Sequence, residues 1–280
     1  MTKNWFITGV STGFGKHLAD LALAQGDKVA ATFRQQDQAD DFTKQAGPNG
    51  VGFVADVADE EQVKTAVAAA IQALGHLDVV VNNAGYGSLG PIEEVPDAEV
   101  QRQFDINVFG PLRVIRAVLP HLRARKSGHI LNVTSIGGLT TFPGAGIYHG
   151  SKFALEGIGE SLAKQVEPLG IRVTNVEPSG FRTDWAGRSA TYTQPRIADY
   201  NDTVGKNLKM SQENSGKQAG DPARAAQAMF DLVRMDHPPL HLPLGKMAVK
   251  ASLEKFAAIT KEIEQHAKIG EGADFPSEEK

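Results

Sequence analysis

Short apolar runs alternate with longer amphipathic segments along most of the chain. Continuous apolar runs are typical of buried strands in a parallel sheet, whereas apolar positions three and four residues apart indicate helices. The runs predict strands at residues 5–8, 28–33, 51–55, 77–82, 130–134, 171–176 and 240–242. The helical spacing predicts helices at residues 16–25, 36–46, 59–74, 97–126, 151–166, 221–234 and 247–266. This alternation predicts an α/β fold, with a doubly wound parallel sheet and helices on both faces.

The pattern runs on without a break between domains. We find no internal repeat and no interdomain linker, and 280 residues with 41% hydrophobic content suit one large core. We therefore expect a single-domain, Rossmann-type unit over residues 1–269. Residues 184–220 are polar and lack regular apolar periodicity, which predicts a substrate lid within this domain. Residues 270–280 are predicted to be a disordered tail.

Composition narrows the possible surroundings and partners. No apolar run approaches the roughly 20 residues that span a bilayer, and the first strand begins too early to leave room for a signal peptide. The chain has no cysteine, which excludes disulfides, and no pair of histidines has metal-ligand spacing. The chain has a net charge of −4. The basic cluster at residues 123–126 is therefore interpreted as cations that stabilise a helix C-terminus, and not as a nucleic-acid site. We expect a cytoplasmic protein with no metal, no nucleic-acid partner and no membrane association.

A glycine-rich turn joins the first predicted strand to the first predicted helix. Gly9, Gly13 and Gly15 have the spacing G-x-x-x-G-x-G, which differs from the usual dinucleotide fingerprint. Glycines there permit positive φ angles and let backbone N–H groups approach a pyrophosphate at the helix N-terminus. An ordinary glycine-rich loop is the alternative interpretation, so this motif predicts a dinucleotide site only in combination with a second site.

That second site contains side chains that can transfer a proton to or from an alcohol or carbonyl oxygen. Tyr148 and Lys152 are four residues apart, so on a helix they share one face. Ser135 follows a predicted strand, where its hydroxyl could hold the substrate oxygen. To act as a base near neutral pH, the phenol needs a pKa about 3 units below its usual value, which the positive charges of Lys152 and of a bound oxidised dinucleotide would supply. Singly, these could be a core tyrosine, a solvated lysine and a turn serine; their combination favours the site.

The motifs together resemble those of the short-chain dehydrogenase/reductase family. Their order and spacing match that family from about residue 3 to 183: Thr8-Gly9-x-x-x-Gly13-x-Gly15, Asn82-Asn83-Ala84-Gly85, Asn107, Ser135, Tyr148-x-x-x-Lys152 and Pro178. Residues 31–34 and 177–183 are similar to a branch with bacterial relatives of estradiol 17β-dehydrogenase and retinol reductases. Ser179 departs from the family pattern, which usually has glycine there, and we expect an altered loop at this position.

The resemblance implies an oxidoreductase that transfers hydride between a nicotinamide cofactor and a carbonyl or secondary alcohol substrate. Ser135 would orient the substrate oxygen, and Tyr148 would transfer its proton as acid or base. Lys152 and Asn107 would support the relay, with Asn107 holding a local kink in its helix. The implied cofactor-binding residues are Gly9, Ser11, Gly13, Phe14, Gly15, Arg34, Asp56, Val57, Asn83, Ala84, Gly85, Tyr148, Lys152, Pro178, Phe181 and Thr183. An epimerase or dehydratase on the same fold and a cofactor-sensing regulator without turnover are the alternatives.

The end of the second predicted strand distinguishes the two nicotinamide cofactors. An acidic residue there, about 20 residues past the glycine loop, binds the ribose 2′-hydroxyl of NAD(H). Here the position holds Phe33, followed by Arg34, whose guanidinium can pair with the 2′-phosphate of NADP(H). Ser11 could add a hydrogen bond. We therefore predict that NADP(H) is preferred and that NAD(H) is possible.

The resemblance also implies an assembly. In this family the long helix ending near Lys126 and the helix that carries Tyr148 commonly pair across a two-fold axis. We therefore expect a homodimer or homotetramer.

Overall fold

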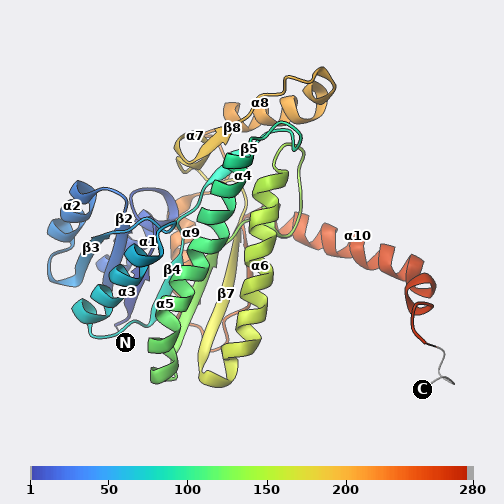
Figure 1. Cartoon of the computed structure of the whole chain (residues 1–280). Helices are drawn as coiled ribbons and strands as arrows, with labels where there is room; N and C mark the ends of the chain where they lie inside the picture. Colours follow the sequence, from blue (N-terminus) through green and yellow to red (C-terminus); the bar gives the residue numbers. More distant parts are fainter. Residues whose placement is uncertain (1, 276–280) are drawn as a thin grey trace.

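Seven parallel strands form the centre of the molecule (Figure 1). The computed structural model describes residues 2–275, apart from the side chain of Ala186. The strands of the sheet lie in the order β3-β2-β1-β4-β6-β7-β9. Their bounds are Asn4–Ile7 (β1), Lys28–Phe33 (β2), Gly50–Val54 (β3), Val79–Asn82 (β4), Gly128–Val133 (β6), Ile171–Pro178 (β7) and His241–Leu244 (β9). The predicted α/β class and the doubly wound parallel sheet are confirmed.

Helices cover both faces of this sheet. The described α-helices are Gly13–Ala24 (α1), Gln36–Ala46 (α2), Glu60–Leu74 (α3), Asp97–Phe104 (α4), Gly110–Arg125 (α5), Gly146–Val166 (α6), Trp185–Arg188 (α7), Lys206–Glu213 (α8), Pro222–Leu232 (α9) and Lys246–Glu271 (α10), of which α7, α8 and α10 lie away from the sheet faces (Figure 1). Because side chains alternate along a strand, Trp5 and Ile7 pack with α1 and α9, whereas Phe6 packs with α3 and α5. This alternation produces two apolar layers, one on each side of the sheet.

The strand order places a crevice at the carboxyl ends of the strands. β1 lies between β2 and β4. Strands β2 and β3 follow on one side of β1, whereas β4, β6, β7 and β9 follow on the other side. In open parallel sheets, ligands bind at such a switch point. The glycine turn, the loop after β4 and the loop after β6 all end at this edge.

Residues 184–220 are more regular than predicted. They contain α7, the strand Ala190–Tyr192 (β8), a π-helical turn at Asn201–Gly205 and α8. β8 pairs in parallel with the short strand Gly87–Leu89 (β5) to form a second, two-stranded sheet. The sequence did not predict β5 or β8, because three residues are too few to show a periodicity and their pairing joins segments about 100 residues apart.

Two helices also differ from their predicted form. The long helix predicted over residues 97–126 is interrupted by a π-helical turn, Asp105–Phe109, between α4 and α5. This turn contains Asn107, where a kink was predicted. α10 continues to Glu271, so residues 270 and 271 of the expected disordered tail are helical, whereas residues 276–280 lie outside the described part of the chain.

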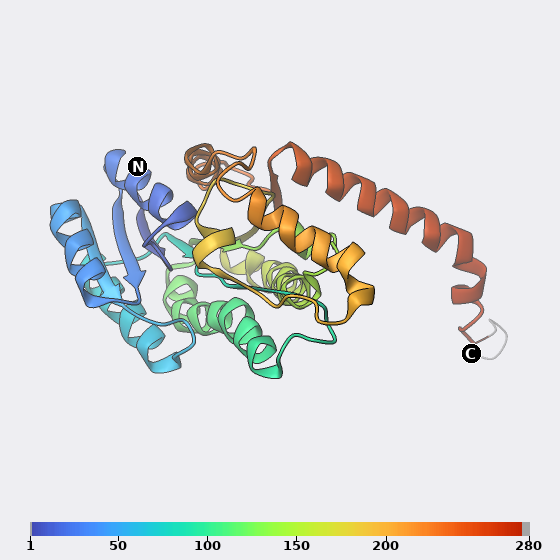
Figure 2. The same cartoon turned by 90° about the horizontal axis from the view of Figure 1, so that it is seen from above.

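α10 projects away from the rest of the molecule after its first turns (Figure 2). Although it is 26 residues long, neither it nor any other described helix is both long and apolar enough to cross a membrane.

Candidate active site

A cleft of about 1000 Å³ opens at the carboxyl edge of the sheet. Its walls come from the loops that follow β1, β2, β3, β4, β6 and β7, together with α6 and α7. The predicted site residues that line it are Gly9, Ser11, Gly13, Phe14, Arg34, Asp56, Val57, Asn83, Ala84, Gly85, Ser135, Tyr148, Lys152, Pro178, Phe181 and Thr183. Gly15 and Asn107 do not line the cleft. The fold therefore brings residues from seven separate parts of the chain to one place, and two predicted residues act from behind the wall.

The glycine turn has the backbone that its sequence requires. Gly9 and Gly13 have φ angles of +70° and +59°, in the region that only glycine adopts at low cost. A side chain on Gly9 would press on Ala84, with Cβ only 3.0 Å from the Ala84 Cα atom. At Gly15 it would collide with the Asn83 amide and the Gly9 carbonyl oxygen. Gly15 thus permits close packing of the turn, which explains why it lies outside the cleft.

Thr8 and Asn83 bind the glycine turn to the loop after β4. The Thr8 hydroxyl oxygen accepts hydrogen bonds from the N–H groups of Asn83 and Ala84, at 3.0 and 3.1 Å. The Asn83 side chain donates to the carbonyl oxygens of Thr8 and Gly9, both at 2.9 Å. Asn83 was predicted only as a cofactor-binding residue, so this role of its side chain was not anticipated. Both loops are held by side chains of the motifs themselves, so they form one rigid wall.

Ser135, Tyr148 and Lys152 meet at one side of the cleft. Ser135 begins the short 3₁₀ turn Ile136–Gly138, where its hydroxyl oxygen accepts from the Gly137 N–H at 2.9 Å. Its own O–H is then available to donate to a ligand oxygen. The Lys152 ammonium donates to the Val133 carbonyl oxygen at 2.9 Å and lies 5.9 Å from the centre of the Tyr148 ring. The shared helical face that the sequence predicted for Tyr148 and Lys152 is therefore present.

The protonation of these two side chains is governed by burial. Burial raises the pKa of the Tyr148 phenol to about 12, and the Ser135 hydroxyl acts in the opposite direction. Burial lowers the pKa of Lys152 to about 8, and the nearby Glu156 carboxylate opposes that change. The lowered phenol pKa expected from the sequence included the charge of a bound oxidised cofactor, and in the protein alone burial shifts the phenol pKa in the opposite direction. In the protein by itself Tyr148 is a neutral phenol, which is the form that donates a proton.

Asn107 lies one layer behind the cleft, inside the π-helical turn. Its side-chain oxygen accepts from the Tyr86 N–H, and its amide donates to the Tyr86 carbonyl oxygen, both at 2.8 Å. The amide also lies 3.2 Å from the Ser151 hydroxyl. These contacts hold the backbone just after Gly85 and one face of α6. They join Asn107 to neither Tyr148 nor Lys152 directly, so a share in a proton relay stays a prediction.

The far wall of the cleft comes from α7. The Trp185 ring packs against the Tyr148 ring with 5.1 Å between centres, and a side chain on Gly87 would collide with it. Arg188 donates to the Thr12 hydroxyl at 2.9 Å, across the mouth of the cleft. Residues 184–220 therefore contact both the candidate proton donor and the glycine turn.

Arg34 occupies the end of the cleft below β2. Its side chain is exposed and makes no ion pair or hydrogen bond within residues 2–275, while the neighbouring Phe33 is buried. Gln35 and Gln38 are its other neighbours along this wall, and neither carries a charge. A free guanidinium therefore faces this end of the cleft without a competing carboxylate on the adjoining residues.

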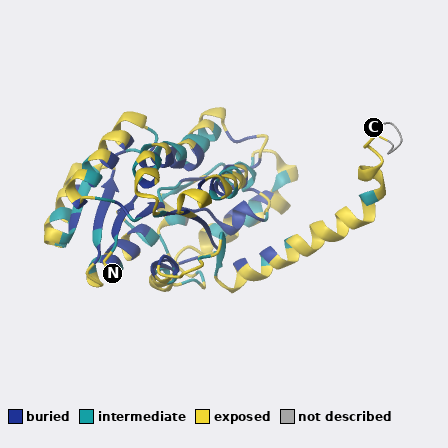
Figure 3. Ribbon diagram, turned by 90° about the horizontal axis from the view of Figure 1, so that it is seen from below, coloured by how far each residue is buried: buried dark blue, intermediate teal, exposed yellow. Residues whose placement is uncertain are grey.

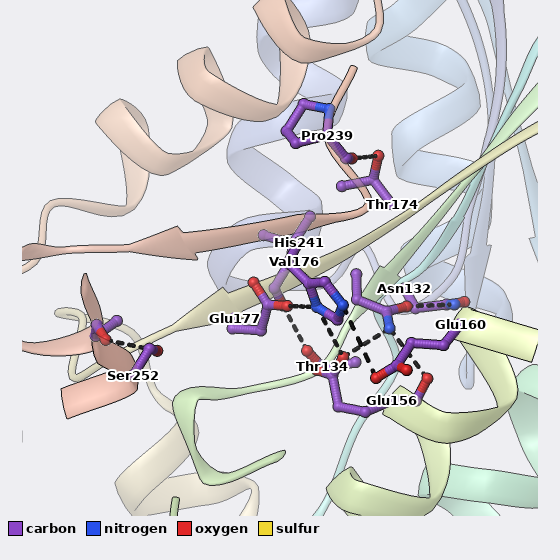
Figure 4. Close-up of polar contacts among 12 residues, drawn as sticks. Asn132, Thr134, Glu156, Glu160, Thr174, Val176, Glu177, Pro239, His241 and Ser252 are labelled. Atoms are coloured by element: carbon purple, nitrogen blue, oxygen red, sulfur yellow. Dashed lines mark hydrogen bonds and ion pairs between the residues drawn. The ribbon is translucent and has the colours of Figure 1, made fainter. Parts of the chain in front are cut away.

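Glu156, Glu177 and His241 form a polar cluster between α6, β7 and β9 that was not predicted from the sequence (Figure 4). Glu177 of β7 lies 2.8 Å from the His241 Nδ1 atom, and Glu156 of α6 accepts from the Asn175 amide at 2.6 Å. Burial raises the pKa of Glu156 to about 7 and that of Glu177 to about 9. Two features of the sequence could have predicted this cluster. Glu177 lies inside an otherwise apolar strand, and Glu156 follows Lys152 by one helical turn. The three side chains could hold a metal ion, but burial favours protonated carboxyl groups, and the expectation of no metal stays a prediction.

Comparisons with known proteins agree with this geometry. Residues 3–193 match the family model for short chain dehydrogenases. The chain is 39% identical to Oxidoreductase BOA17 of Botryotinia fuckeliana (strain B05.10) over 252 residues, which are 89% of this chain and 91% of that protein. It superposes on a short-chain dehydrogenase from Streptomyces avermitilis with a TM-score of 0.90 and 37% identity, covering 98% of both chains.

Two more distant solved structures hold nicotinamide cofactors. ElxO, 25% identical with a TM-score of 0.74, contains NADP; 89% of this chain and 100% of that chain are covered. A 3-ketoacyl-(acyl-carrier-protein) reductase from Brucella melitensis, 26% identical with a TM-score of 0.71, is complexed with NADH, with 86% and 96% covered. The family model matches more than half of the chain, and the parallel sheet agrees with it. One cleft also contains the glycine turn together with Ser135, Tyr148 and Lys152. This chain belongs to the short-chain dehydrogenase family of oxidoreductases.

Proposed function

We propose that the protein is an NADP(H)-dependent oxidoreductase that interconverts a carbonyl compound and a secondary alcohol. One observation carries the proposal: Ser135, Tyr148 and Lys152 line the same cleft as the glycine turn. A proton donor next to a dinucleotide-sized groove is what hydride transfer to a carbonyl requires. A protein that only senses a cofactor has no need of this proton-transfer group.

The residues of the cleft fit a nicotinamide dinucleotide. The glycine turn has no side chains to obstruct a pyrophosphate, and α1 begins at Gly13 with its N-terminal N–H groups toward the cleft. Asp56 and Val57 would flank the adenine, and Gly85 would leave clearance for the nicotinamide half. Arg34, free of any protein carboxylate, would pair with a 2′-phosphate, which supports NADP(H) over NAD(H). When bound, such a cofactor supplies the hydride for reduction or accepts it in oxidation.

The side chains around the substrate oxygen perform the proton chemistry. Ser135 donates its hydroxyl hydrogen to the carbonyl oxygen, since its oxygen is already occupied by the Gly137 N–H. Tyr148 then delivers a proton to the same oxygen as negative charge develops there. Lys152 is held by the Val133 carbonyl oxygen and retains further N–H groups for a ribose hydroxyl. The neutral phenol is the form that donates the proton when the carbonyl is reduced.

The outer wall suggests the substrate and the assembly. Trp185 and Tyr148 form an apolar surface above the reacting atoms, which suits a carbonyl compound with an apolar body, as in the steroid- and retinol-type branch. We propose that residues 184–220 act as the substrate lid, and that the protein works in the cytoplasm. We further propose a dimer or tetramer that pairs α5 and α6, since Phe109 and Phe153 on this side are 51% and 42% exposed.

Absorbance at 340 nm tests the proposal directly. We expect NADPH oxidation with a panel of ketosteroids, retinal, quinones and 3-ketoacyl thioesters. Cofactor binding without turnover on any of them would favour the cofactor-sensing regulator. Conversion of a substrate without net NADPH consumption would favour the epimerase or dehydratase.

A further inference from the structure

α10 is a helical arm that is anchored only at its first turns (Figure 3). Ala248 and Ser252 are buried, and Ala248 packs with Ile136 and Leu139 of the loop that follows Ser135. From residue 256 to residue 266, every residue is exposed. The outer part of the arm therefore has no packing partner within residues 2–275.

One face of this arm is apolar. Val249, Leu253, Phe256 and Ile263 are exposed by 45%, 67%, 51% and 63%, and their spacings of four, three and seven residues place them along one stripe. Ile259, at 37%, borders the stripe. Most helices in proteins gain their stability by packing an apolar face against a partner. The stripe is thus an apolar helix face that lacks such packing within residues 2–275.

The charges along the arm indicate what kind of partner fits. The inner half, residues 246–258, carries three lysines and one glutamate, whereas the outer half, residues 259–271, carries three glutamates and two lysines. The inner half is net positive and the outer half net negative. Two copies of the arm are therefore complementary when they run in opposite directions and repel at both ends when they run in parallel.

A lipid surface fits this pattern less well. Helices that lie on membranes carry an excess of lysine and arginine on their polar face, to bind anionic lipids. Over its whole length α10 carries five lysines and four glutamates, so its attraction to an anionic surface is small. The separation of charge along the axis would contribute nothing to membrane binding, but it directs antiparallel pairing.

We propose that α10 is a self-association arm that pairs antiparallel with α10 of a second copy of this chain. A two-fold axis then passes near Phe256, the centre of the stripe. Val249 faces Ile263 of the partner subunit, and Leu253 faces Ile259 of the partner subunit. The contact uses the same surface on both copies, as a closed two-fold interface requires. It is separate from the contact proposed for α5 and α6 and does not depend on turnover.

Sedimentation of the full chain tests the pairing. Leu253→Glu places a charge within the stripe and should halve the mass of the assembly at micromolar concentration, raising the dissociation constant at least about 100-fold. Ala258→Glu adds the same charge on the opposite face and should leave the mass unchanged. Unaltered circular dichroism and NADPH binding establish that both variants fold. A Leu253→Glu variant with the wild-type mass would overturn the proposal.

Cysteine cross-linking tests the direction and register, because the natural chain contains no cysteine. Phe256→Cys should form an intermolecular disulfide by itself under mild oxidation, and Ala258→Cys should not. Val249→Cys should cross-link only when mixed with Ile263→Cys. Self-cross-linking of Val249→Cys would disprove the antiparallel arrangement. Arms that remain monomeric and co-sediment with phosphatidylglycerol vesicles would replace the second copy with a lipid partner.

Discussion

The inner and outer walls of the cleft are built from different kinds of contact. The inner wall consists of the strand-end loops at residues 8–15, 82–85 and 134–138, and partly buried hydrogen bonds between Thr8 and Asn83 join the first two of these loops. The outer wall, residues 184–220, is attached by the short β5–β8 pairing, by the packing of Trp185 on Tyr148 and by exposed side-chain contacts such as the 2.6 Å hydrogen bond between Tyr200 and Glu93. Buried bonds are costly to break, whereas exposed ones exchange readily with water. We therefore predict that the inner wall is preformed and that the outer wall opens more readily.

Replacing Tyr148 by Phe gives the largest expected effect and tests the chemistry assigned to the inner wall. The variant keeps the ring but loses the transferable proton, so kcat should fall by about 10²–10⁴-fold. The dissociation constant for NADPH should stay nearly unchanged, because the phenol contributes little to cofactor binding. Stopped-flow turnover and fluorescence titration measure the two quantities. A variant that keeps more than half of the wild-type kcat would remove Tyr148 from the mechanism.

Replacing Arg34 by Ala tests cofactor selection at the far end of the same wall. Loss of a charge-assisted contact to the 2′-phosphate should raise the KM for NADPH by about 10–100-fold. The KM for NADH should scarcely change, since NADH has no phosphate at that position. Steady-state kinetics with both cofactors give the comparison. A wild-type kcat/KM that favours NADH would contradict the assignment.

The buried carboxyl groups give the inner wall a predicted pH dependence. Burial raises the pKa of Glu177 above its ordinary value, to about 9, so the folded protein holds a proton that the unfolded chain releases above about pH 4.5. The free energy of unfolding should therefore decrease as pH rises from 4.5 toward 9, with a slope of up to about 1.4 kcal/mol per pH unit for each such group.

Glu177→Gln should flatten this slope, because the amide mimics the protonated carboxyl group. Glu167→Gln, at an exposed carboxylate that is not among the groups shifting the pKa of Glu177, serves as the control and should leave the slope intact. Urea unfolding at several pH values provides the measurement. Equal slopes in the wild type and Glu177→Gln would place the titrating group elsewhere.

The smallest expected effect concerns the outer wall. Arg188→Ala removes the exposed contact to Thr12 and should lower the local opening free energy by about 0.2–1 kcal/mol. Amide hydrogen exchange in residues 184–220 should then become a few times faster, with no change in the strands of the sheet. Lys206→Ala, on the exposed face of α8, is the control. In the wild type, equal protection with and without NADPH and substrate would count against a lid.

Sequence pattern anticipated the inner wall much better than the outer one. The strands and glycines of the inner wall carry local signals: continuous apolar runs, a glycine at each positive φ angle, and two functional side chains one helical turn apart. β5 and β8 carry no such signal, since each exists only through pairing with the other. The Asn83 side chain and the Glu156–Glu177–His241 cluster were missed for the same reason, because their partners are distant in the chain.

The sequence by itself determined the parallel α/β fold, the family motifs and the residues expected to perform proton transfer. These depend on short-range chemistry: the period of apolar positions, the backbone freedom of glycine and the spacing of side chains on a helix. Only the tertiary structure decided that Gly15 and Asn107 lie behind the cleft, that the Tyr148 phenol is buried and its pKa thereby raised, and that α10 extends from the molecule as an arm (Figure 2). Each of these depends on burial or on contacts across the fold, and burial is set by which segments pack together and cannot be read from neighbouring residues alone.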